Sequence, residues 1–151
     1  MKLRINGQSI SMSELRRVWE EDVTISIGEK AKKKISSSME MINNAVKNGE
    51  KIYGINTGFG KLAQTKINKE ELVLLQKNII SSHAVGVGEL LPQSIVRLTM
   101  VLKVNTLAQG FSGVTQNLVD ALCNLINHSV YPCVPSKGSV GASGDLAPLA
   151  H

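Results

Sequence analysis

The most informative stretch of this chain runs Gly138-Ser139-Val140-Gly141-Ala142-Ser143-Gly144-Asp145-Leu146-Ala147-Pro148-Leu149-Ala150-His151, called here the signature segment. Its three glycines give the first half an unusually free backbone. Asp145, Leu146 and Ala147 then indicate the start of a helix, whose first turn tolerates Pro148. The pattern predicts a glycine-rich loop that leads into a helix N-terminus, where developing negative charge is stabilised.

Two common catalytic motifs are excluded here. A nucleophile elbow needs Gly-x-Ser-x-Gly, but the residue two places after Ser143 is Asp145. A dinucleotide-binding fingerprint needs Gly-x-Gly-x-x-Gly after a strand, and this spacing is absent. A generic glycine and serine loop before a helix is the plain alternative, but such a loop does not need this order of residues.

Two further motifs precede the signature segment. Tyr53-Gly54-Ile55-Asn56-Thr57-Gly58-Phe59-Gly60 is a glycine-rich loop able to open and close, and it is not a phosphate-binding loop because Leu62 follows Gly60-Lys61. Ser81-Ser82-His83-Ala84-Val85-Gly86-Val87-Gly88 ends a predicted helix. Taken alone, Tyr53 is an ordinary loop tyrosine and His83 an ordinary helix-end residue.

Together these three motifs resemble those of the aromatic amino acid ammonia-lyases, over about residues 53–151. In that family the triplet matching Ala142-Ser143-Gly144 cyclises into an electrophilic methylidene-imidazolone (MIO) ring. The resemblance implies that the amide nitrogen of Gly144 attacks the carbonyl carbon of Ala142 and that Ser143 loses its hydroxyl, so two water molecules leave. Glycine suits the tight turn this needs. No external cofactor and no metal ion are implied.

The resemblance also implies roles for single residues. Tyr53 would be the base that removes the substrate β-proton, which needs a positive or hydrogen-bonding environment because the ordinary pKa of tyrosine is about 10. His83 would bind the substrate side chain, and Gly60 and Asp145 would support the site. The segment around His83 is most similar to the histidine-specific branch. The expected reaction is therefore elimination of ammonia from L-histidine to give trans-urocanate.

Three alternatives stay open. The same chemistry would serve a tyrosine or phenylalanine ammonia-lyase, or an aminomutase. A non-catalytic helical assembly fragment is suggested by the predicted helix near residues 92–109, which is apolar on nearly every side. A nucleic-acid-binding module would rest only on the net charge of +5 and on Lys30-Ala31-Lys32-Lys33-Lys34. No aromatic platform accompanies these lysines, so we expect a solvated helix face and no nucleic-acid partner.

The expected fold is mainly α, the helical N-terminal domain of the ammonia-lyase fold. Helices are predicted at about residues 11–21, 29–47, 69–83, 92–109 and 115–128. A β-hairpin turning at Asn6-Gly7 is predicted over residues 2–10, with a strand at 23–27. Residues 1–151 are expected to form a single N-terminal domain, truncated relative to the family because the C-terminal helical part is absent. The resemblance implies a homotetramer for full-length members and little or no activity for this chain alone.

Composition sets the remaining expectations. The chain is 42% hydrophobic and 19% charged, which is typical of a globular protein. Its two cysteines show no metal-ligand spacing. No apolar signal core or membrane-spanning run is present, so we expect a cytoplasmic protein without a membrane partner.

Overall fold

The computed structural model describes residues 1–57, 67, 69–139 and 146–151. Helices dominate this part of the chain, which confirms the mainly α class. Its contacts form two compact units. The first comprises Met1–Ile42 and Leu91–Pro132, and the second Asn43–Leu90 and Cys133–His151. The expectation of one domain over residues 1–151 stays a prediction.

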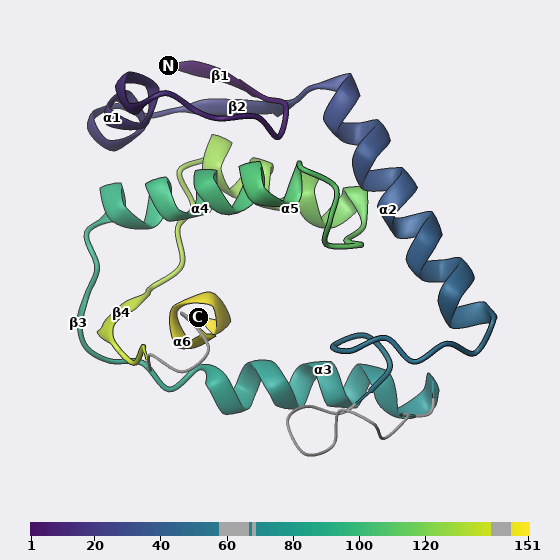
Figure 1. Ribbon diagram of the computed structural model, residues 1–151. Coiled ribbons are helices and arrows are strands. Elements are labelled where there is room, and N and C mark those ends of the chain that lie inside the picture. Colours follow the sequence, from purple (N-terminus) through teal and green to yellow (C-terminus); the bar gives the residue numbers. More distant parts are fainter. Residues whose placement is uncertain (58–66, 68, 140–145) are drawn as a thin grey trace. The chain divides into compact units, whose positions relative to one another are not determined.

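The first unit begins with a small parallel β-pair. β1 (Lys2–Ile5) lies beside β2 (Thr24–Ile27), and α1 (Met12–Glu20) connects them (Figure 1). Alternate strand residues are buried, as period-two patterning requires: Leu3, Ile5, Ile25 and Ile27. Asn127 secures the pair, since its side chain accepts from the Ile25 amide at 2.7 Å and donates to the Ile25 carbonyl at 3.0 Å. The predicted strand element near the N-terminus is therefore present.

The predicted hairpin over residues 2–10 is wrong. β1 pairs with β2, and the chain after Gly7 forms no partner strand. The end of another helix occupies that place: a Cβ on Gly7 would come within 2.5 Å of the Ala108 carbonyl oxygen, and Asn105 donates to the Gln8 carbonyl at 2.9 Å. Gly7 has φ +67°, so its glycine character serves this close approach as well as the bend.

The first two long helices match their predictions because their end signals are satisfied. At α1, Ser11 accepts from the Glu14 amide while Glu14 accepts from the Ser11 amide, which forms a capping box. α2 (Glu29–Lys47) ends at the predicted Asn48-Gly49: the amides of Gly49 and Glu50 donate back to Val46 and Ala45. Its lysines at 30, 33 and 34 are exposed, as expected for a solvated face.

Helices α4 (Gln93–Leu107) and α5 (Gln116–Asn127) form the core of the first unit with α1 and the strands. Val96, Val101 and Val104 are buried on α4, and Val119 and Ile126 on α5. α4 is not apolar all round. Its exposed residues in the described structure are Gln93, Thr99, Leu102, Lys103 and Thr106.

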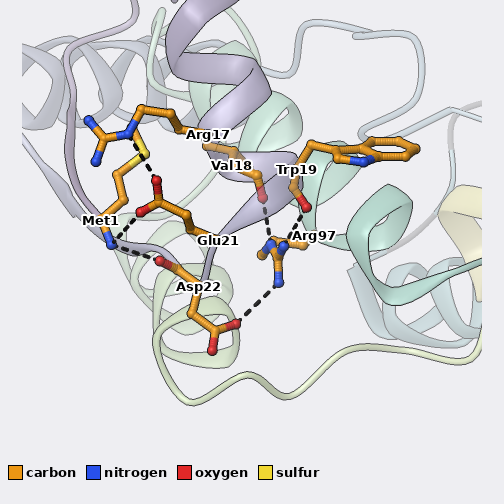
Figure 2. A network of polar contacts seen from close by, with 7 residues as sticks. All are labelled: Met1, Arg17, Val18, Trp19, Glu21, Asp22 and Arg97. Carbon is orange, nitrogen blue, oxygen red and sulfur yellow. Dashed lines mark hydrogen bonds and ion pairs between the residues drawn. The ribbon is translucent and has the colours of Figure 1, made fainter.

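A buried arginine joins α4 to the end of α1. The Arg97 guanidinium donates from Nε to the Val18 carbonyl at 2.6 Å and from Nη2 to the Trp19 carbonyl at 2.7 Å (Figure 2). These carbonyls belong to the last turn of α1, which has no intrahelical donor for them. Asp22 accepts from Nη1 at 3.2 Å, but its side chain is largely exposed. The two carbonyl contacts are therefore the stronger part of the network.

The second unit contains the remaining elements. α3 (Lys69–His83) leads into β3 (Val87–Leu90), which pairs antiparallel with β4 (Pro135–Lys137). α6 (Leu146–Ala150) follows and contacts α3. Val87 faces Lys137 and Leu90 faces Pro135, with an irregularity between these pairs. Among the described residues, no helix has the length and apolar character needed to cross a bilayer.

The Arg97 network generates the first prediction. Replacing Arg97 with Ala removes the donors from two carbonyls at a buried helix end, which should lower the free energy of unfolding by about 3 kcal/mol. Arg97→Lys should recover only part of this loss because an ammonium lacks the planar fork. Urea denaturation of the purified variants measures both effects. Arg17→Ala is the control, since its ion pair with Glu21 is exposed and its loss should change little. Equal losses for Arg97→Ala and Arg17→Ala would contradict this account.

The two cysteines generate the second prediction. Cys123 is buried and Cys133 is exposed, and both are free thiols. Burial first, and the Asp120 charge second, raise the pKa of Cys123 to about 11. The neutral thiol is therefore favoured at Cys123, and the thiolate is the reactive form. Native alkylation with iodoacetamide followed by peptide mass mapping should modify Cys133 first and Cys123 only after unfolding. Similar native rates at both positions would contradict the burial of Cys123.

Candidate active site

Tyr53 lies in a turn held by a neighbouring asparagine. The Asn56 side chain accepts from the Ile52 amide at 2.8 Å and donates to the Glu50 carbonyl at 2.8 Å. Asn56 is only 3% exposed, whereas Tyr53 is 63% exposed. Gly54 has φ +77°, which the turn requires. The buried amide thus braces a loop whose tyrosine side chain reaches the surface.

His83 is the last residue of α3 and is partly buried. Its Nδ1 lies 2.8 Å from the Ile79 carbonyl oxygen. A carbonyl only accepts, so Nδ1 carries the proton and the Nε2 of a neutral ring is left as an acceptor. Ser82 also donates to the Ile79 carbonyl, at 2.9 Å. The helix end therefore fixes both the tautomer and the orientation of this imidazole.

The segment after His83 meets both ends of the signature segment at Gly86. The Gly86 amide donates to Nε2 of His151 at 2.9 Å. A Cβ on Gly86 would lie 2.8 Å from that nitrogen and 3.1 Å from the Cβ of Pro135. Only glycine fits there without displacing a neighbour.

The earlier end of the signature segment packs on the same residue. A Cβ on Gly138 would lie 3.0 Å from the Cα of Gly86 and 3.2 Å from the Cβ of Ala147. Gly138 has φ +148°, a value that side-chain-bearing residues rarely adopt. The junction of Gly86, Gly138, Ala147 and His151, called here the Gly86 junction, thus gathers residues on both sides of the triplet.

None of the predicted site residues belongs to the Gly86 junction itself. The His83 segment and the two ends of the signature segment meet at the Gly86 junction. Ala142, Ser143, Gly144, Asp145 and Gly60 lie outside the described residues, so their predicted roles stay predictions. The same holds for the relation of Tyr53 to the triplet. α6 begins at Leu146 and contains Pro148, as predicted.

Sequence reasoning missed two residues of this region. Asn56 had a local signal, because asparagine favours turns through bonds to nearby backbone, but its burial did not follow from that. His151 had no signal for its contact with Gly86, since the two residues are 65 positions apart. The third histidine, His128, makes a local contact at the end of α5, where its Nδ1 donates to the Asn124 carbonyl at 2.8 Å.

His83 offers an oriented nitrogen acceptor, and Tyr53 a phenol. Within the described ranges, no cluster of three or more histidine, cysteine, aspartate or glutamate side chains could hold a metal ion.

Comparisons with known proteins match the chain over nearly its whole length. A family model described as aromatic amino acid lyase matches residues 10–151. The chain is 48% identical to a histidine ammonia-lyase of Vibrio cholerae over 151 residues, covering all of this chain and 30% of that protein. The chain thus spans about a third of the length of the curated relatives it matches.

Solved structures agree with the fold. A histidine ammonia-lyase from Trypanosoma cruzi superposes with a TM-score of 0.88 at 34% identity, over 99% of this chain and 28% of that one. A tyrosine aminomutase from Streptomyces globisporus gives a TM-score of 0.91 at 31% identity, with the same coverage. The match of the family model over residues 10–151 leads to one conclusion: the chain belongs to the aromatic amino acid lyase family.

Proposed function

We propose that this chain is the N-terminal part of an ammonia-lyase that acts on L-histidine and releases ammonia and trans-urocanate. Family membership and histidine ammonia-lyase relatives at about half identity support the reaction class. The observation that carries the proposal is the Gly86 junction, which holds both ends of the signature segment against the segment that begins at His83. An electrophile precursor and a side-chain-binding residue would therefore belong to one site.

The described residues fit an MIO precursor at Ala142-Ser143-Gly144. Cyclisation needs a tight turn, and holding the two ends of a short loop in contact lowers the entropy cost of closing it. The contacts of Gly138 and Ala147 supply this constraint. When formed, the ring would supply an electrophile that makes ammonia a better leaving group. No external cofactor or metal ion is then required.

His83 would select the substrate. Its Nδ1 is engaged by Ile79, so Nε2 would accept a hydrogen bond from the imidazole N–H of histidine. A phenylalanine ring has no such donor, and the acceptor would then be desolvated without a partner. The imidazole of His83 thus favours a substrate with a polar side chain.

Tyr53 would remove the β-proton of the substrate. Its exposed position on a turn braced by Asn56 would let it approach a bound molecule while the backbone stays fixed. Acting as a base would require a cationic or strongly donating environment around the phenol. Gly60 and Asp145 are proposed as supporting residues.

The resemblance extends the proposal to the assembly. Full-length members would form a homotetramer in the cytoplasm, and residues beyond this segment would complete the site. This chain alone would then have little or no lyase activity. The tyrosine aminomutase at TM-score 0.91 keeps an aminomutase as the second candidate, because the two activities share their chemistry. Product analysis with histidine, tyrosine and phenylalanine separates them.

Intact mass tests the prosthetic group. The purified chain should weigh less than its sequence by two water molecules, and digestion should assign the deficit to residues 142–144. The Ser143→Ala variant is the control, because without the hydroxyl the methylidene cannot form. An unmodified wild-type mass would contradict cyclisation in this chain.

Substitution of His83 tests substrate selection in the lyase that contains this chain. His83→Leu should lower kcat/KM for histidine about 100-fold, since a polar contact to the substrate is lost, while turnover of phenylalanine should not fall. His128→Leu is a matched control, because His128 makes the same Nδ1 contact to the carbonyl four residues earlier. Equal effects of the two substitutions would rule out a role of His83 in selectivity.

A further inference from the structure

We propose that His151 is a positioning residue that ties the end of the signature segment to the segment beginning at His83. This inference rests on the proposed function, because its consequence is the placement of the Ala142-Ser143-Gly144 precursor relative to His83. His151 does not itself touch substrate in this proposal. It acts through the backbone of Gly86.

The first argument is the chemistry of the contact. The Gly86 amide is a donor, so the His151 Nε2 that lies 2.9 Å away must present a lone pair. The neutral ring then carries its proton on Nδ1. This is the same tautomer as that of His83, whose Nδ1 donates to a carbonyl. Only a side chain with an acceptor at the Nε2 position can replace His151 here.

The second argument is the fit around Gly86. The ring edge of His151 occupies the space that a Cβ on Gly86 would need, with Nε2 at 2.8 Å and Cδ2 at 3.1 Å from that position. Gly138 packs on the other atoms of the same residue. The backbone of Gly86 is thus held between residues from both ends of the signature segment.

The third argument is the position of His151 on its helix. Its amide donates to the Ala147 carbonyl at 3.2 Å, which continues the bonding of α6. The hydrogen bond from Gly86 therefore anchors the far end of the short helix that begins directly after Asp145. Gly86 lies only three residues after His83, whose ring is fixed to α3. If the hydrogen bond to Gly86 were lost and α6 shifted, its first residue, Leu146, would move relative to His83.

Two variants of the 151-residue chain test this role. His151→Gln places an amide oxygen near the position of Nε2, whereas His151→Leu fills similar space without an acceptor. In His151→Leu, hydrogen exchange of the Gly86 amide should rise about fivefold, as expected for loss of one neutral hydrogen bond. His151→Gln should restore slow exchange. The Gly113 amide, which donates to Ser38 in the first unit, is the internal control and should not change.

The same samples report the consequence for the precursor. The fraction of chain lacking two water molecules should fall in His151→Leu and recover in His151→Gln. If the Gly86 amide exchanged as slowly in His151→Leu as in the wild-type chain, the proposed tie would be overturned. Faster exchange with an unchanged cyclised fraction would overturn the positioning role. A wild-type chain without the mass deficit would instead count against the proposed function, while exchange at Gly86 would still decide whether the tie exists.

Discussion

The close packing of residues from three chain segments at Gly86 is the constraint on which the second unit depends. A Cβ at this position would overlap His151 and crowd Pro135, and Gly138 packs on its Cα. β3 and β4 pair directly beside it, so the short sheet and the Gly86 junction reinforce each other. Strands as short as β3 and β4, and a helix of five residues such as α6, have little stability alone. Their mutual contacts at one glycine explain how such short elements keep a defined arrangement.

The first unit is stabilised by a different kind of contact, hydrogen bonds from side chains to backbone groups. Here helix ends are completed by side chains from distant sequence, as when Arg97 donates to the last carbonyls of α1. Asn127 does the same for the middle of β2. Each contact satisfies backbone groups that would otherwise be buried without partners, which is costly in a small core. The apolar residues supply the burial, and these polar contacts determine which elements lie together.

The structure also relates the two imidazoles of the second unit. His83 has its proton directed into its own helix, and His151 has its acceptor directed at Gly86. Nε2 of His83 therefore remains available as an acceptor, whereas Nε2 of His151 accepts a structural hydrogen bond from Gly86. Residue type alone does not distinguish these roles, because both are histidines at the ends of helices. The difference comes from which nitrogen faces a carbonyl and which faces an amide.

Local signals determined most of the secondary structure. The stripe on residues 29–47, the stop at Asn48-Gly49 and the cap at Ser11 act within a few residues, so the sequence alone predicted these helices. Order-specific motifs likewise identified the family and the candidate residues Tyr53, His83 and the triplet. The tertiary structure alone decided the parallel pairing of β1 with β2, the burial of Arg97, and the contact of His151 with Gly86. These features join residues tens of positions apart, and a contact of that kind depends on packing geometry that no local pattern records.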